Sequence, residues 1–498
     1  MSLTIDPEAI KEVSARVATH YHLMPLGYRG NVLRVALPPP VEASLLDELR
    51  VVLRRDVSAE SAPPEEIEKA IKEHYGIGAA TLETLAGRDA ASEESSAAVV
   101  ADDDLEGARD ASVVKLVNQI FLEAYQSRAT DIHLEPYADE FHVRYRIDGI
   151  LYDAKFSDSL KRHQSAVISR VKIMADLSIA EKRLPQDGRI RVRVEGKDLD
   201  MRVSTLPTPF GEGIVIRLLT SRQLLDLRHL GFAQEDLSTL ESFLKLPHGV
   251  IFLTGPTGSG KTTTLYSFLS LLNTSEHKII TMEDPIEYQL KGITQVQVNP
   301  KIGLTFAAGL RSMLRHDPDI MMVGEVRDLE TAEITIRVAL TGHLVFSTLH
   351  TNDAASAATR LLDLGLEPYL VSSSVLCLIA QRLVRLVCDS CRRERPVTPE
   401  LRAEFGIDPA APAGPLFEGK GCEACKGTGF RGRTVIYEML PITNDIRALV
   451  MSRAPANLIQ EKAVAQGMKT LRRSGWEKVS RGLTTPEEVL RVTLRETA

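Results

Sequence analysis

One eight-residue segment limits the fold of this chain more than any other. Residues 255–262 read Gly-Pro-Thr-Gly-Ser-Gly-Lys-Thr and match the pattern G-x-x-x-x-G-K-[ST] at every fixed position. An apolar run at residues 250–253 precedes it, and apolar residues recur at helical spacing over residues 265–272 after it. The order of strand, glycine-rich loop and helix predicts a P-loop, whose backbone N–H groups and helix N-terminus bind phosphate oxygens.

The residue types of this segment suit a nucleoside triphosphate with Mg²⁺. The glycines let the backbone fold tightly around an oxyanion. The lysine supplies charge for the β- and γ-phosphates, and the hydroxyl after it is a Mg²⁺ ligand. The predicted nucleotide-binding residues are Gly255, Pro256, Thr257, Gly258, Ser259, Gly260, Lys261, Thr262 and Thr263.

Three further apolar runs end in polar side chains. Residues 278–282 lead to Glu283 and Asp284, residues 320–323 to Gly324 and Glu325, and residues 344–349 to His350. Near-continuous apolar runs are typical of parallel strands covered on both faces, and ligands bind beyond the carboxyl ends of such strands. We therefore expect these clusters to gather with the P-loop at one edge of one α/β sheet.

Each cluster suggests a role in triphosphate hydrolysis. Glu325 is placed to orient or deprotonate the attacking water, and Glu283 to hold Mg²⁺ or water. His350, together with His343 before the last strand, is a candidate sensor of the γ-phosphate. The alternatives are a helix-capping role for Glu325, a structural role for Glu283 or Asp284, and ordinary hydrogen-bonded histidines.

Four of the five cysteines form two paired hooks. Cys388 and Cys391 make one C-x-x-C segment, and Cys422 and Cys425 make the other. Two such hooks predict a closed four-thiolate zinc site. A redox pair explains only one hook, and a nucleic-acid zinc finger is the weaker alternative. We expect Cys377, in an apolar run, to be a buried thiol.

Charge and hydropathy narrow the class of protein. The net charge is −7, and residues 81–110 alone hold nine acidic residues against two arginines. Acidic and basic residues balance in the rest of the chain. This argues against nucleic acid as the main partner, because phosphate binding needs a basic excess. The sequence shows no apolar run of membrane-spanning length and no signal peptide, so we expect a cytoplasmic protein with at most peripheral membrane attachment.

The pattern divides the chain into several parts. We predict a small α/β docking module at 1–80, an acidic flexible linker at 81–110, a mixed domain at 111–222, a connecting segment at 223–245 and the P-loop domain at 246–498. In the first module a helix runs through Ile10, Val13 and Val17, a strand covers 31–37, and helices cover about 42–54 and 64–75. A cysteine lobe interrupts the P-loop domain at 387–430, and residues 440–498 are helical.

Taken together, these motifs resemble the secretion-ATPase superfamily. Residues 255–262, 283–287, 317–325 and 341–352 are similar to its Walker A, Asp box, Walker B and His box, in that order. Residues 127–135, 144–149 and 182–189 are similar to its second N-terminal domain. The best match is the E-type traffic ATPases of type II secretion, and the resemblance covers about residues 110–498 strongly.

The resemblance implies a fold and a function. It implies a RecA-like ATPase domain with an inserted Cys₄ zinc lobe, preceded by a PAS-like α+β domain and the N-terminal module. It implies a homohexamer that uses ATP, Mg²⁺ and structural Zn²⁺ to power pseudopilus assembly, attached to the inner membrane by a membrane-anchored partner bound to residues 1–80. The alternatives are a type IV pilus extension ATPase, a DNA-translocating motor, and a scaffold with an inactive P-loop.

Further site residues follow only from this resemblance. Arg202 and Arg217 match arginines that act on a neighbour's nucleotide, and Arg433 matches a position near the nucleotide. Residues 211–213 read Gly-Glu-Gly where relatives often have Gly-Glu-Arg, so we expect Gly213 to make that loop more mobile.

The cysteine lobe and its flanks are rich in basic residues. A surface of this kind suggests contact with anionic lipid, and the alternative is that these residues pair with acidic groups or with nucleotide. The residues are Arg382, Arg385, Arg392, Arg393, Arg395, Lys420, Lys426, Arg431 and Arg433.

Overall fold

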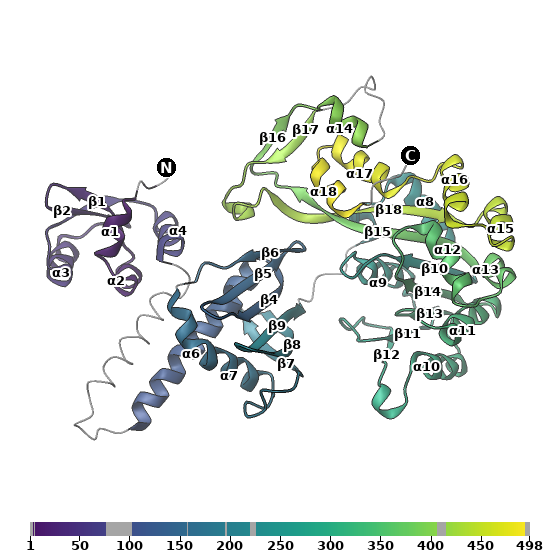
Figure 1. The fold of residues 1–498 in the computed structure, drawn as a ribbon, viewed down its shortest axis with the longest axis horizontal. Helices are drawn as coiled ribbons and strands as arrows, with labels where there is room; N and C mark the ends of the chain where they lie inside the picture. The colour runs from purple at the N-terminus through teal and green to yellow at the C-terminus, as the bar shows by residue number, and fades with distance from the viewer. Residues whose placement is uncertain are drawn as a thin grey trace. The chain divides into compact units, whose positions relative to one another are not determined.

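A computed structural model describes residue 3 and residues 5–75, 102–156, 158–194, 197–219, 226–405 and 415–493. The chain separates into two compact units, residues 1–220 and 221–498, and each is described by itself. Figure 1 shows the elements of both units.

The N-terminal module is a three-stranded sheet with four helices. The sheet has the order β1 (Met24–Arg29), β2 (Val32–Leu37), β3 (Val57–Ser61), and the helices are α1 (Pro7–Lys11), α2 (Ala15–His20), α3 (Ala43–Leu53) and α4 (Pro64–Tyr75). The helix expected through Ile10, Val13 and Val17 is two helices, because Ser14 caps α2 by accepting a hydrogen bond from Val17 N. The strand expected at 31–37 and both later helices are confirmed.

A second module contains a six-stranded antiparallel sheet. Its order is β6 (Ile150–Asp153), β5 (Phe141–Ile147), β4 (Ala129–Pro136), β9 (Gly211–Leu219), β8 (Lys197–Thr208), β7 (Gln186–Val194). Helices α6 (Asp102–Gln126) and α7 (Gln164–Met174), which follows η1 (Asp158–His163), share the core with one face of the sheet. Helix α6 begins inside the stretch predicted as a linker, and residues 81–101 lie outside the described residues.

The second unit is built on a seven-stranded sheet. Its order is β12 (Thr294–Gln297), β11 (Ile279–Glu283), β13 (Ile320–Val323), β14 (Leu344–Leu349), β10 (Gly249–Thr254), β15 (Val375–Val387), β18 (Phe430–Pro441). The pairs from β12 to β15 are parallel, and β18 runs antiparallel to β15.

Alternating residues of the central strand enter two different cores. Val250 and Phe252 belong to one apolar cluster, and Ile251 and Leu253 belong to the other. Helices cover both faces, which explains why the strands are apolar at consecutive positions. The helices of this unit are η2 (Leu227–His229), α8 (Gln234–Leu244), α9 (Lys261–Leu272), η3 (Pro300–Ile302), α10 (Phe306–Met313), η4 (Leu314–His316), α11 (Leu329–Leu340), α12 (Ala354–Asp363), α13 (Pro368–Ser374), α15 (Asn444–Met451), α16 (Ala456–Ala465), α17 (Leu471–Ser480) and α18 (Pro486–Val492).

The cysteine lobe lies between the last two strands of this sheet in sequence. It consists of a two-stranded ribbon, β16 (Arg392–Arg395) with β17 (Leu416–Gly419), the helix α14 (Pro399–Glu404) and the short turn η5 (Glu423–Cys425). Within the described parts of the chain, no helix is both long and apolar enough to cross a bilayer.

Candidate active site

The P-loop joins the central strand β10 to helix α9. Gly255, Gly258 and Gly260 have φ values of 144°, 80° and 92°, which side chains rarely adopt. Pro256, Thr257 and Gly258 are exposed, whereas Ser259 is buried. The Ser259 hydroxyl has no hydrogen-bond partner among the described residues. The loop therefore has the exposed tip, the left-handed backbone and the unused donor that a phosphate site needs.

Lys261 begins α9 and folds back over the loop. Its Nζ donates to the carbonyl oxygens of Gly255 at 2.6 Å and Pro256 at 3.1 Å. Burial and the nearby charge of Arg382 lower the pKa of Lys261 to about 8, although Glu325 opposes this shift. A cation that is partly buried without a paired anion suits a site that receives phosphate. Thr262 and Thr263 follow on the exposed side of the first turn. Mg²⁺ binding by Thr262 stays a prediction.

Glu325 and His350 lie together at the sheet edge where the P-loop begins. The Glu325 carboxylate accepts a hydrogen bond from His350 Nε2 at 3.1 Å, and its other oxygen pairs with Arg327 at 2.7 Å. The side chain of Glu325 is only 12 % exposed. The predicted meeting of these strand-end groups is thus observed. His343 precedes β14 and lies at the opposite edge of the sheet, so the expectation that both histidines face nucleotide is corrected.

Glu283 occupies a different position from the one expected. It is 3 % exposed and accepts hydrogen bonds from Thr281 Oγ1 at 2.6 Å, from Gln295 Nε2 at 3.0 Å and from the Tyr266 hydroxyl. Because both carboxylate oxygens already have protein donors, the surroundings of Glu283 do not support direct Mg²⁺ binding. The carboxylate instead connects β11 with the P-loop helix, which carries Tyr266.

Arg202 and Arg217 lie in the second module, on the face of its sheet opposite the core. The two arginines face each other across β8 and β9, and Arg202 also faces Arg189 on β7. Nε of Arg217 donates to Asp131 at 2.9 Å. Cross-strand partners share one face, so the arginines form a row along the sheet. Their action on a neighbouring subunit stays a prediction.

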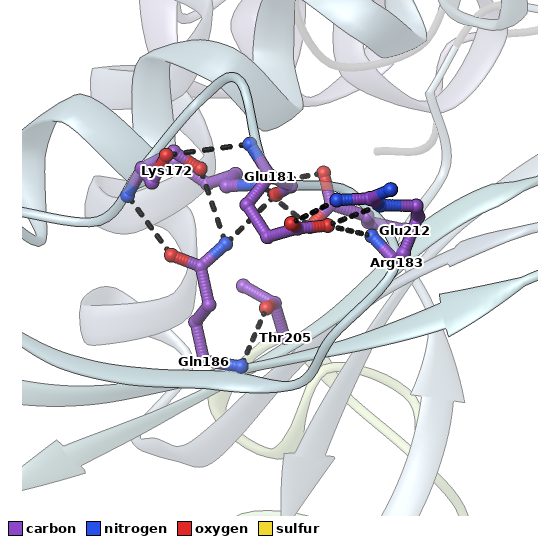
Figure 2. A network of polar contacts seen from close by, with 7 residues as sticks. Lys172, Glu181, Arg183, Gln186, Thr205 and Glu212 are labelled. Carbon is purple, nitrogen blue, oxygen red and sulfur yellow. Dashed lines mark hydrogen bonds and ion pairs between the residues drawn. The ribbon is translucent and has the colours of Figure 1, made fainter.

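Gly213 lies within strand β9 rather than in a mobile loop. It pairs with Leu206 on β8, and the residue before it, Glu212, is buried. The carboxylate of Glu212 accepts two hydrogen bonds from Lys172 at 2.7 and 2.9 Å, and Lys172 also donates to the carbonyl of Glu181 at 2.7 Å. Figure 2 shows how this network joins α7, β9 and the segment before β7. The expected loop is therefore corrected to a strand, with an ion pair beside Gly213.

The four paired cysteines form one cluster. The Sγ atoms of Cys388 and Cys422 are 3.8 Å apart, those of Cys391 and Cys425 are 3.8 Å apart, and those of Cys422 and Cys425 are 3.7 Å apart. A tetrahedron with zinc–sulfur bonds of about 2.3 Å has sulfur–sulfur edges of about 3.8 Å. The donor set and its spacing thus fit a tetrahedral metal ion. Cys377 is a fully buried thiol outside this cluster, as expected.

Backbone donors favour the thiolate form within the cluster. The Cys425 sulfur accepts hydrogen bonds from the N–H groups of Cys422 at 3.1 Å and Gly429 at 3.2 Å. Burial raises the pKa of Cys425, but these bonds, together with side-chain bonds to Cys422 and Cys391, lower the pKa to about 6. Burial raises the pKa of Cys391 to about 12, so the thiolate form is favoured at Cys425 and not at Cys391.

Several arginines of the expected basic surface have partners within this unit, and one is buried. Arg382 is 8 % exposed, and Arg385 forms an ion pair with Glu488 at 2.6 Å. The arginines of β16 are engaged as well: Arg392 stacks on Phe417, Arg393 bonds to Glu418 and Arg395 pairs with Glu487. Five residues of the surface are nevertheless exposed, namely Arg392, Arg393, Lys420, Lys426 and Arg431. Contact of this surface with anionic lipid therefore stays a prediction.

Arg433 lies on β18 opposite Arg385 of β15. Strand β15 passes the P-loop just before this point, so Arg433 is at the sheet edge that carries the loop. Its contact with nucleotide stays a prediction.

Sequence reasoning missed Gln381, which bonds to the P-loop, and considered its neighbour Arg382 only as part of a basic surface. Gln381 and Arg382 are buried in β15, and the Gln381 side chain bonds to the loop and to α9. The signal that could have identified Gln381 was its position beside Arg382 in a run of residues that is otherwise mostly apolar.

Comparisons with known proteins agree with this geometry. A family model described as Type II/IV secretion system protein matches residues 106–491, and one described as MshEN domain matches residues 1–81. Type II secretion system protein E of Xanthomonas campestris pv. campestris is 46 % identical, covering 98 % of this chain and 86 % of the relative. Type IV pilus assembly ATPase PilB of Myxococcus xanthus is 43 % identical, covering 98 % and 87 %.

Two solved structures are also similar. The pilus retraction motor PilT with bound ADP has a TM-score of 0.50 at 26 % identity, covering 75 % of this chain and 96 % of that one. The ATPase DotB of Legionella pneumophila has a TM-score of 0.55 at 20 % identity, covering 75 % and 94 %, and supports the fold alone.

Proposed function

The chain belongs to the Type II/IV secretion system protein family and is an ATP-hydrolysing P-loop enzyme, and from this premise we propose that it powers pseudopilus assembly and protein export by a type II secretion system. The family resemblance inferred from the motifs is thereby confirmed. The observation that carries the hydrolytic part of the proposal is the juxtaposition of Glu325 and His350 at the sheet edge where the P-loop and Lys261 lie. The secretion part rests on the relatives named type II secretion system protein E.

The reaction is in-line attack of water on the γ-phosphate, without a covalent intermediate. Lys261 neutralises phosphate charge, and the P-loop N–H groups bind phosphate oxygens. Glu325 orients and deprotonates the water, and His350 fixes the direction of the Glu325 carboxylate. Thr262 holds Mg²⁺, which neutralises charge on the phosphates when it is bound. Glu283 stabilises the position of α9.

The working assembly in this proposal is a homohexamer. Arg202 and Arg217 of one chain reach the nucleotide of the next and neutralise charge that develops on the γ-phosphate. Zinc is the metal held by Cys388, Cys391, Cys422 and Cys425. Residues 1–80 bind a membrane-anchored protein of the secretion system, which keeps this cytoplasmic ATPase at the inner membrane.

Assembly of type IV pili is the second candidate function. It is favoured by the 43 % identity to a relative named as a type IV pilus assembly ATPase, over 98 % of this chain. Several relatives of comparable identity are named type II secretion system protein E, which favours secretion. Co-purification of the membrane protein that binds residues 1–80 distinguishes the two systems.

Substitution of Glu325 tests the proposed chemistry. We expect Glu325→Gln to bind ATP nearly as well as the wild type and to lose turnover, since general-base help is worth about 10²–10⁴ in rate. Lys261→Ala should weaken ATP binding as well. Normal steady-state hydrolysis by purified Glu325→Gln protein would reject the assignment.

A further inference from the structure

Strand β15 passes directly beneath the P-loop. Ile379 and Ala380 pair with the last two residues of β10, and the strand then continues to Gln381 and Arg382. Both are buried, at 1 % and 8 % exposure. Polar side chains in such a position are normally held by hydrogen bonds, and their partners here belong to the nucleotide site.

Gln381 uses both ends of its amide on the P-loop and its helix. Its Nε2 donates to the Ser259 carbonyl at 2.8 Å, and its Oε1 accepts from Thr264 Oγ1 at 3.0 Å. These bonds fix the loop backbone immediately before Lys261 and the helix one turn after it. A single side chain therefore sets the geometry of the loop-to-helix junction.

The loop lies so close to β15 that two of its glycines have no room for a side chain. A Cβ on Gly255 would lie 2.6 Å from the Gln381 carbonyl oxygen, and one on Gly260 would lie 2.8 Å from Gln381 Nε2. A Cβ on Gly258 would meet nothing within 4 Å. Close packing on β15 thus adds a reason for glycine at 255 and 260, besides the backbone conformation shared by all three.

Arg382 connects the backbone of β15 beside the P-loop with Asn352, two residues after His350. Its Nη1 donates to the Gln381 carbonyl at 3.0 Å, and its Nη2 donates to the Asn352 carbonyl at 2.9 Å. Nη1 would also lie 3.0 Å from a Cβ on Gly255. Within the described residues Arg382 forms no ion pair, so its buried charge is held by carbonyl dipoles beside an anion site.

We propose that Gln381 and Arg382 are positioning residues of the ATP site: Gln381 fixes the P-loop backbone, and Arg382 ties Gln381 to the segment that follows His350. The inference rests on the proposed hydrolysis of ATP. It connects occupancy of the P-loop with the segment next to the His350–Glu325 pair, through Gln381, Arg382 and Asn352. Phosphate binding at one end of this chain of contacts then orders the water-activating groups at the other.

Two conservative substitutions test the proposal. Arg382→Lys keeps the charge but cannot bridge two carbonyl groups in the same way. Gln381→Glu keeps the shape but replaces the donor to Ser259 by an acceptor. Arg360→Lys, on the exposed surface of α12, is the matched control. Folding of each full-length variant is checked by thermal unfolding, the dissociation constant of Mg·ADP is measured, and kcat is measured with ATP.

A merely structural role would not change how nucleotide binding at the P-loop affects residues 350–353. We therefore measure that effect. In the wild type, Mg·ADP should protect amides of both the P-loop and residues 350–353 from hydrogen exchange. Arg382→Lys should keep the protection of the P-loop and lose the protection at 350–353. It should also reduce kcat by roughly 10- to 100-fold, because a catalytic group misplaced by about 1 Å can slow the reaction by up to 100-fold. Gln381→Glu should weaken Mg·ADP binding itself.

The outcomes separate this inference from the proposed function. A folded Arg382→Lys protein with wild-type kcat and wild-type protection at 350–353 overturns the inference for Arg382. Unchanged Mg·ADP affinity in Gln381→Glu overturns it for Gln381. If instead the wild type neither binds Mg·ADP nor hydrolyses ATP, the proposed function fails before the variants are compared.

Discussion

At the scale of single residues, Tyr266 on the P-loop helix gives a direct prediction. Its hydroxyl donates to the buried Glu283 carboxylate, and burial with the Glu283 charge raises the pKa of Tyr266. Tyr266→Phe removes this bond, and hydrogen bonds to charged groups are worth roughly 1.5–3 kcal/mol. We expect the free energy of unfolding in urea to fall by about that amount. A loss below a few tenths of a kcal/mol would contradict the network.

The role of Glu283 is tested by replacing its carboxylate with the amide of glutamine. If Glu283 only supports α9, Glu283→Gln should destabilise the protein but leave the Mg²⁺ concentration for half-maximal ATPase activity unchanged. A large increase in that concentration would restore the metal-binding role expected from the sequence.

Residue positions explain why one acidic group was predicted well and the other was not. Glu325 lies two residues beyond the end of β13, so it emerges at the sheet edge, as the strand-end rule predicts. Glu283 is the last residue of β11 itself. Alternation along the strand therefore still governs its direction and turns it toward Tyr266. Sequence alone placed the strand but not its final residue.

At the scale of elements, helix α18 is joined to β15 by a buried carboxylate. Glu488 is 3 % exposed and accepts bonds from Arg385 at 2.6 Å and Arg491 at 2.8 Å. Burial raises the pKa of Glu488, but these arginines outweigh it and lower the pKa to about 2 from 4.5. A depressed folded-state pKa adds stability above the unfolded-state pKa, and this stability is lost as the pH falls from about 4.5 to about 2.

This linkage predicts a pH-dependent cost of Glu488→Gln. The substitution should lower the free energy of unfolding by at most about 3 kcal/mol at pH 7, and the difference from the wild type should shrink steadily below pH 4.5. Glu461→Gln, on the exposed face of α16, is the control. A difference that stays constant from pH 7 to pH 3 would contradict the assignment.

The cysteine lobe predicts metal-dependent folding. Replacing Cys388 and Cys391 by serine should remove one zinc ion per chain and lower the melting temperature, because metal-binding energy is folding energy in such sites. Cys377→Ala, outside the cluster, should keep its metal. Elemental analysis and thermal unfolding measure both effects, and wild-type protein without zinc would show that the site is misread.

Several elements were predictable because their signals are local. The C-x-x-C hooks and the glycine-rich loop depend on short spacings, so the cluster and the loop form where expected. The ion pair of Arg385 was not predictable, because its partner Glu488 is distant in sequence. The acidic composition of residues 102–110 also led to the prediction of a linker where α6 begins. Acidic residues are favourable at a helix N-terminus, so the same composition is compatible with a helix.

At the scale of the whole molecule, the account depends on two halves of one site being supplied by different chains. Each chain carries Lys261 and Glu325 in one unit and the row of Arg189, Arg202 and Arg217 in the other. In the proposed ring, the arginines of one chain serve the P-loop of its neighbour. ATP turnover should therefore depend on assembly, and diluting the ring to monomers should abolish it.

The most direct test of this claim is the ATPase rate of mixed rings. Arg217→Ala and Glu325→Gln chains should each be inactive alone, and rings assembled from both should regain part of the activity at interfaces where an intact Glu325 meets an intact Arg217. Mixtures of Lys261→Ala with Glu325→Gln are the control and should stay inactive, since both changes affect the same half of the site. Recovery in the first mixture only is the predicted result. No recovery at any ratio would contradict a site shared between chains.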